Sequence, residues 1–198
     1  MAIWTMTFAA EALARWNDPT YGLISPAVFV PISINFSRLD FELSDPVKEV
    51  STCIDKYKIS KDDIHVEITE TALTETDNKL QTAMNSFREK GFSLWLDDFG
   101  SGYSGLNVLK DFTFDMMKID MKFLSKFSEN EKTRPILSSI IALAKNIGMQ
   151  TLTEGVETKE AYSFLKSIGC QRLQGYLFGK PMPKDEFLKK ILPGEYSV

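Results

Sequence analysis

Short apolar runs and longer amphipathic runs alternate along most of the chain. An apolar run of about four to eight residues is typical of a buried strand, whereas apolar positions that recur about every three or four residues are typical of a helix. Six strand-like runs are each followed by a helix-like run, which predicts an α/β fold with a parallel sheet. The predicted strands are residues 29–36, 64–69, 93–97, 114–119, 150–153 and 171–175, and the helices that follow them are residues 45–57, 77–90, 105–110, 134–146, 159–167 and 184–190.

Individual residues set the ends of several of these helices. Ser44 is expected to cap the helix that begins at Asp45, because a serine side chain accepts hydrogen bonds from the free amides of a first helical turn. Gly91 and Gly148 are expected to end the helices that precede them, since glycine readily adopts the left-handed conformation. A further apolar stretch over residues 5–10 leads to Glu11.

Polar residues gather where the predicted strands end. Asp97 and Asp98 follow an apolar run, and two adjacent carboxylates beside a core strand are costly unless a cation, such as a magnesium ion, holds them. In a (β/α) barrel the catalytic groups come from the carboxyl ends of the strands. The polar residues at these ends are Glu11, Asn35, Glu67, Glu70, Asp97, Asp98, Lys118, Asp120, Glu154 and Gln174. This ring of oxygen ligands with one lysine predicts a metal site on the rim of a barrel.

Seven short motifs in this ring resemble, in the same order, the motif series of the EAL-domain family, bacterial phosphodiesterases that cut cyclic di-GMP to linear pGpG. The resemblance extends from residue 11 to residue 183 and is specific because seven motifs match, although any one of them would be a weak signal. It implies a TIM-type (β/α) barrel and a single EAL-like domain over residues 1–198. The motifs are Glu11–Trp16, Ser33–Ser37, Glu67–Glu70, Asp97–Gly102, Lys118–Asp120, Glu154–Glu157 and Gln174–Tyr176.

The resemblance also implies two divalent ions, Mg²⁺ or Mn²⁺. Two ions about 4 Å apart activate a water and stabilise both the attacking and the leaving oxygen of an in-line displacement at phosphorus. Lys118 matches the family lysine that orients or deprotonates this water, and orienting is favoured because acting as a base needs a large pKa shift. Glu154 matches a residue that supports the second ion. The implied metal ligands are Glu11, Asn35, Glu67 and Asp97 for one ion, with Asp97 and Asp98 reaching the other.

Three residues match positions near the bound dinucleotide. Arg15 carries a guanidinium, which suits a phosphate by both charge and geometry. Leu13 and Gln174 belong to motifs at the same place, so the resemblance implies that all three contact the substrate.

Four further residues match supporting positions. Glu70 matches the family residue that anchors the loop after Asp98, through a partner such as Ser101. The same loop is implicated in the family's dimer contact, so a homodimer is expected. Asp120 and Glu157 are expected to support the ligands without binding an ion themselves.

Each of these residues also has a purely structural interpretation. A pair such as Asp97 and Asp98 is often a solvated turn, and Glu67 can lie on the wet face of an edge strand, because it alternates with two apolar neighbours. Lys118 can be a rim lysine and Asn35 a turn residue. Each interpretation is plausible alone, but all of them together are not, since the motifs occur in series.

Composition limits the classes of function. With 198 residues, 43% of them hydrophobic, one domain with a sizeable core is expected. A net charge of −4 and a pI near 5.2 give no basic surface for duplex nucleic acid. No apolar run is long enough to span a membrane, and residues 1–8 lack a charged signal region, so a cytoplasmic chain is expected. Cys53 and Cys170 lack a metal-binding spacing, and the only histidine, His65, excludes a histidine-rich site.

One interval is too short for the predicted barrel. Glu11 and Asn35 are 24 residues apart, whereas Asn35 to Glu67 is 32 and Glu67 to Asp97 is 30, and a βαβ unit needs roughly 30. The barrel is therefore expected to be shortened or incomplete between residues 16 and 32, a turn-rich stretch without a helix of useful length. Either the domain is naturally short or residues are missing there. The second alternative is favoured because deleting a helix would expose core.

The predicted function is hydrolysis of cyclic di-GMP to linear 5′-pGpG by in-line attack of water with two metal ions. A catalytically inactive cyclic di-GMP receptor is the first alternative, and a protein-interaction module on the same fold is the second. Regulatory input is expected from outside this chain, for example from a domain on a longer parent protein. The residues whose presence argues against both alternatives are Glu11, Asn35, Glu67, Asp97, Asp98 and Lys118.

Overall fold

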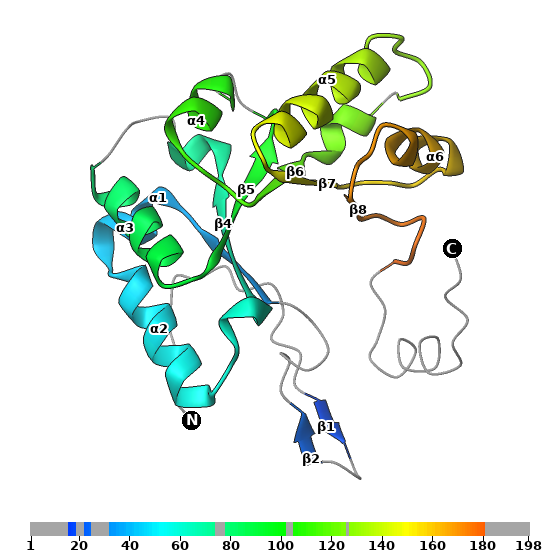
Figure 1. The fold of residues 1–198 in the computed structure, drawn as a ribbon. Helices are drawn as coiled ribbons and strands as arrows, with labels where there is room; N and C mark the ends of the chain where they lie inside the picture. The colour runs from blue at the N-terminus through cyan, green and yellow to red at the C-terminus, as the bar shows by residue number, and fades with distance from the viewer. Residues whose placement is uncertain are drawn as a thin grey trace.

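The computed structural model describes residues 32–73, 78–101, 105–125 and 127–180, together with the backbone of residues 16–18 and 22–24. A parallel sheet of six strands forms its centre, and the strands lie side by side in their order along the chain (Figure 1). Their carboxyl ends meet at one edge, which we call the rim. The strands are β3 (Ile32–Phe36), β4 (Ile64–Thr69), β5 (Ser93–Phe99), β6 (Met116–Ile119), β7 (Gln150–Thr153) and β8 (Arg172–Leu173).

Helices lie along the outside of the curved sheet, with α2 and α3 towards one end and α5 and α6 towards the other (Figure 1). None of the helices in the described part of the chain is long and apolar enough to cross a membrane. The α-helices are α1 (Arg38–Leu43), α2 (Pro46–Tyr57), α3 (Asn78–Glu89), α4 (Gly105–Asp111), α5 (Thr133–Asn146) and α6 (Lys159–Ser167), and the 3₁₀ helices are η2 (Lys61–Asp63), η3 (Glu70–Leu73) and η4 (Met121–Leu124).

The predicted α/β order is confirmed, but the segment after β3 differs from its prediction. Two helices, α1 and α2, occupy it in place of one. The prediction that Ser44 caps α2 is wrong, because Ser44 ends α1 and the side chain of Asp45 accepts the hydrogen bond of the Lys48 amide at 3.0 Å. Asp45 is an equally good cap chemically, since its carboxylate also favours the positive end of the helix dipole.

The described strands form an open, barrel-like sheet, and no closed barrel is seen among the described residues. The predicted helix over residues 184–190 and the apolar stretch over residues 5–10 lie outside the described part. In the interval expected to be short and turn-rich, the strands β1 (Trp16–Asp18) and β2 (Gly22–Ile24) pair with each other in antiparallel fashion.

The two faces of the sheet differ in chemistry because successive side chains of a strand point to opposite faces. On the face that packs under the helices, the central strands contribute wholly buried apolar side chains. The residues that alternate with these along β4, β5 and β6 include Glu67, Asp97 and Lys118, which therefore lie on the other face, near the rim. The wholly buried side chains are Val66, Ile68, Leu94, Leu96, Met117 and Ile119.

Candidate active site

A β-bulge brings two carboxylates to the rim at the end of β5. The register between β5 and β6 shifts between Leu96 and Phe99, so that two residues, Asp97 and Asp98, oppose the single residue Lys118. A bulge of this kind bends its strand and redirects the side chains at the insertion. Asp98 adopts a positive φ of 55°, a conformation that aspartate tolerates better than most residues. The sequence Asp97-Asp98 therefore reaches the rim as an irregular strand end, which differs from a solvated turn.

Three carboxylates converge on the ammonium group of Lys118. Its Nζ lies 2.8 Å from Asp97 Oδ1, 3.0 Å from Glu67 Oε2 and 3.0 Å from Glu154 Oε1. Lys118 itself is only 9% exposed and Glu67 3%. These partners come from β4, β5 and the residue after β7, so the parallel sheet supplies the arrangement. One positive charge faces three negative charges in a largely buried place, which leaves an excess of negative charge to be compensated.

The pKa values at the rim follow from this crowding. Burial by itself would lower the pKa of Lys118, but its hydrogen bond to Asp97 and the charges of Asp97 and Glu67 outweigh burial and raise that pKa well above its ordinary value. Burial raises the pKa of Glu154, although Lys118 partly offsets this effect. The pKa of Asp98 is also raised, by burial and then by the charges of Asp97 and Asp120. These shifts favour the charged form of Lys118 and the neutral forms of Glu154 and Asp98, as expected where several carboxylates are buried around one ammonium group.

Asn35 joins the same cluster from β3. One terminal atom of its amide lies 3.1 Å from Glu67 Oε2 and 3.3 Å from Asp97 Oδ2. If this atom is the amide nitrogen, it donates a hydrogen bond to both carboxylates. If it is the oxygen, three oxygen atoms from three strands face one another, and such an arrangement is favourable only around a cation. The identity of this atom therefore depends on whether an ion is bound.

The donor set at the rim fits a hard divalent cation. Amide and carboxylate oxygens, here from Asn35, Glu67 and Asp97, are the ligands that Mg²⁺, Mn²⁺ and Ca²⁺ prefer. Among the residues that the structure describes, no three His, Cys, Asp or Glu side chains are already arranged as ligands of one ion. The carboxylates are arranged around Lys118, and the predicted ligand Glu11 lies outside the described part.

Glu70 anchors the loop that follows the bulge. Its side chain is wholly buried, and its Oε2 accepts a hydrogen bond of 2.8 Å from the Gly100 amide. Gly100 has a φ of 92°, and a Cβ atom there would overlap the ring of Phe123. The predicted partner Ser101 is the next residue, is exposed, and donates its amide to the Asp98 carbonyl at 3.0 Å.

Removing the Glu70 carboxylate is expected to free the Gly100 amide. In Glu70→Ala, the hydrogen exchange of this amide should accelerate by about 10-fold to 100-fold, because a hydrogen bond to a charged group contributes about 1.5–3 kcal/mol. Exchange followed by nuclear magnetic resonance measures this rate. The exposed Glu129 provides a matched control, since Glu129→Ala should leave the Gly100 amide unchanged. An unchanged rate in Glu70→Ala would mean that Glu70 does not hold the loop.

The remaining predicted residues lie around this cluster. Asp120 is nearly buried, and its carboxylate accepts a hydrogen bond from the Lys122 amide at 2.7 Å, which caps η4. Gln174 and Glu157 are exposed, and the backbone of Gln174 pairs with Thr153 and Val156. Glu11, Leu13 and Arg15 lie outside the described residues.

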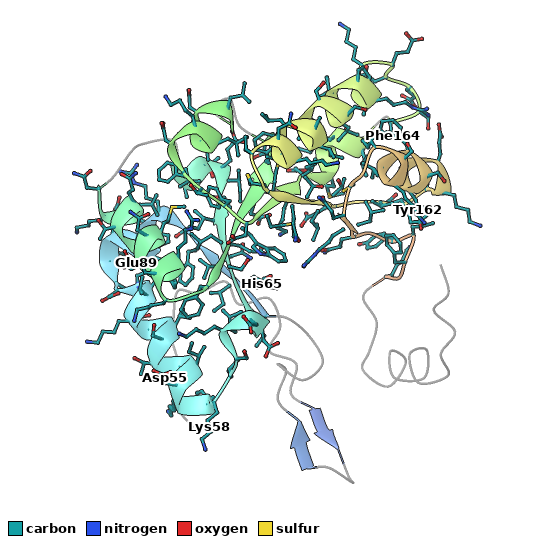
Figure 2. The ribbon with its side chains drawn as sticks, viewed as in Figure 1. Asp55, Lys58, His65, Glu89, Tyr162 and Phe164 are labelled. Atoms are coloured by element: carbon teal, nitrogen blue, oxygen red, sulfur yellow. The ribbon has the colours of Figure 1, made fainter. Side chains whose placement is uncertain are left out.

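A stack of His65, Trp95 and Arg172, which lies on the same face of the sheet as Glu67 and Asp97, was not singled out from the sequence. The rings of His65 and Trp95 stack with centroids 4.1 Å apart, and the guanidinium of Arg172 lies 5.5 Å from the same Trp95 ring. His65 is labelled on the sheet in Figure 2. Burial, followed by the charge of Arg172, lowers the pKa of His65. The sequence showed only that His65 and Trp95, each two residues before a predicted metal ligand, share the face of that ligand, and it did not show that their rings meet.

The comparisons with known proteins agree with the fold. The EAL domain family model matches residues 30–181, which include every described residue of the cluster and begin after Glu11, Leu13 and Arg15. Cyclic di-GMP phosphodiesterase RocR of Pseudomonas aeruginosa is 30% identical over 90% of this chain and 54% of its own length. The alignment spans 213 residues, more than the 198 of this chain, so RocR has residues without a counterpart here. The chain spans between about a quarter and a half of the length of the curated relatives it matches.

Two solved structures resemble the fold closely. The PaMucR phosphodiesterase in complex with c-di-GMP has a TM-score of 0.72 and 29% identity, covering 88% of this chain and 85% of that one. The manganese and cyclic di-GMP complex of Klebsiella pneumoniae BlrP1 has a TM-score of 0.70 and 29% identity, covering 75% of this chain and 38% of that one.

Proposed function

Because the chain belongs to the EAL domain family, we propose that it is a metal-dependent phosphodiesterase that hydrolyses cyclic di-GMP to linear 5′-pGpG. The observation that carries this proposal is the convergence of Glu67, Asp97 and Glu154 on Lys118, with Asn35 against two of the carboxylates. The names of RocR and PaMucR as phosphodiesterases support the substrate class.

The proposed reaction is an in-line displacement at one phosphorus atom of cyclic di-GMP. A water oxygen forms a bond to phosphorus while the bond from phosphorus to the 3′ oxygen breaks, the water loses a proton, and the leaving oxygen gains one. Two Mg²⁺ or Mn²⁺ ions, when bound, supply the activation of this water and neutralise the charge that develops. The residues proposed to hold them are Glu11, Asn35, Glu67, Asp97 and Asp98.

The other residues of the cluster orient the reactants. Lys118 directs an ammonium N–H towards the attacking water, and Glu154 keeps that ammonium in place through the 3.0 Å contact. Glu70 and Ser101 hold the loop after the bulge, and Asp120 and Glu157 support the elements that carry the ligands. The residues proposed to contact the dinucleotide are Leu13, Arg15 and Gln174.

The proposal extends to the organisation of the protein. Residues 1–198 form a single domain, which acts in the cytoplasm as a homodimer and takes its regulation from another domain of a longer parent protein. The support for a longer parent is that the curated relatives are two to four times the length of this chain.

A cyclic di-GMP receptor without catalysis is the second candidate. Its support is that RocR carries residues without a counterpart in this chain and that the family match begins after Glu11. A short or incomplete barrel can retain a ligand-binding rim and lose the reaction, because catalysis tolerates less displacement than binding does.

Incubation of the purified chain with cyclic di-GMP tests the proposal. We expect pGpG to form with Mg²⁺ or Mn²⁺, to disappear with excess chelator, and to return when the ion is restored, because carboxylates without their ions cannot neutralise the developing charge. Chromatography of the products measures the reaction. Tight binding of cyclic di-GMP without any product would contradict the phosphodiesterase proposal and favour a cyclic di-GMP receptor.

A further inference from the structure

The ammonium group of Lys118 lies where the carboxylates of the rim converge. It contacts Glu67, Asp97 and Glu154 at 2.8–3.0 Å, and its side chain is nearly buried. These are short, charge-assisted contacts away from bulk water, so they are stronger than the ion pairs of an exposed lysine. Lys118 thus neutralises part of the negative charge that the parallel strands bring together.

Two of its three partners are also proposed metal ligands. Glu67 Oε2 is shared between Lys118 Nζ at 3.0 Å and the Asn35 amide at 3.1 Å, and Asp97 contacts Lys118 through one oxygen and Asn35 through the other. A divalent ion that binds Glu67 and Asp97 through these oxygens would lie within a few ångströms of the ammonium. Two cations at such a separation repel each other strongly in a poorly solvated place.

We propose that Lys118 and a divalent cation compete for the oxygens of Glu67 and Asp97, so that binding of the ion releases Lys118 from at least one of them. Glu154 then keeps the ammonium at the rim, free to donate to a water. Without the ion, Lys118 is therefore the counterion of the carboxylates. When the ion binds, the ammonium group of Lys118 becomes available to donate a hydrogen bond to a water. This inference rests on the proposed function, because it assumes that a divalent ion binds at this rim.

Removing the charge of Lys118 is expected to strengthen ion binding. Calorimetric titration of Mn²⁺ into chelator-treated protein should give a dissociation constant at least about tenfold lower for Lys118→Met than for the wild type, because the competing cation and its repulsion are gone. Lys118→Arg keeps the charge and should stay close to the wild type. Lys110→Met is the matched control, since Lys110 is an exposed lysine paired with Asp111 on the surface and its loss should leave the affinity unchanged.

A measurement on the wild type covers the case in which Lys118→Met does not fold. The chemical shifts of the Lys118 side chain, labelled with ¹³C and ¹⁵N, should change on addition of Mg²⁺ and saturate at the concentration at which calorimetry shows the site to be filled. Shifts that do not respond to Mg²⁺ would overturn the competition.

The outcomes separate the inference from the function on which it rests. If the wild type and Lys118→Met bind Mn²⁺ with equal affinity, or if the variant binds more weakly, the competition is wrong and the metal-dependent function stands. If neither protein binds Mn²⁺ or Mg²⁺, the proposed metal-dependent function is wrong, and the inference falls with it.

Discussion

Replacing Asp97 by asparagine is expected to lower kcat/KM for cyclic di-GMP by at least about a thousandfold, which corresponds to a loss of about 4 kcal/mol of transition-state stabilisation. Asp97 occupies the bulge, contacts Lys118 at 2.8 Å and lies 3.3 Å from the Asn35 amide. The substitution keeps the shape of the side chain and removes the charge on which both the ion and Lys118 depend. The rate of pGpG formation at saturating Mg²⁺ measures the effect.

Two further variants make the Asp97 result specific. Lys118→Ala should also abolish pGpG formation, because the group proposed to orient the water is gone. Asp111→Asn is the matched control, since Asp111 ends α4 in an exposed pair with Lys110 and should keep wild-type activity. Activity close to the wild type in Asp97→Asn, in a protein that unfolds at the same temperature, would contradict the assignment of this rim as the active site.

The parallel sheet could be predicted because each strand carries its own signal. Residues 64–69 and 150–153 were predicted with the bounds of β4 and β7, and α6 also begins and ends as expected. Helix α1 was missed because six residues are too few to show a period. A usable signal was nonetheless present in the sequence, since Ser37 and Asp40 have the spacing of a capping box, which marks a helix start. In the structure the amide and hydroxyl of Ser37 both donate to Asp40 Oδ2 at 2.7 Å.

The proximity of the described rim residues could be predicted, but their contacts could not. Parallel strands end at one rim, so Glu67, Asp97 and Lys118 were expected to lie near one another before any distance was known. The bulge depends on the register between two strands, and the sequence carries no local signal for that register. The same reason hid the stack of His65 on Trp95, because pairing between strands decides which side chains meet across a sheet.

Phe87→Ala is expected to destabilise the fold by about 3–5 kcal/mol, a large part of the roughly 5–15 kcal/mol that holds a typical domain together. Phe87 lies in α3, is wholly buried, and its ring contacts Phe36 at 5.8 Å and Phe92 at 5.4 Å between centroids. The truncation leaves a cavity that a helix packed against the sheet cannot easily fill. Denaturant unfolding measures the free energy of unfolding.

The matched control for Phe87 is Tyr57, an aromatic residue at the end of α2 that is 62% exposed. Tyr57→Ala should change the free energy of unfolding by no more than about 0.5 kcal/mol, since little apolar surface is uncovered. The Phe87→Ala substitution should also weaken metal binding at the rim. The Phe87 ring joins α3 to Phe36 at the end of β3, directly after Asn35, so the variant should bind Mn²⁺ more weakly even at temperatures at which it remains folded. A wild-type Mn²⁺ affinity in folded Phe87→Ala would show that packing under α3 does not hold β3 in place.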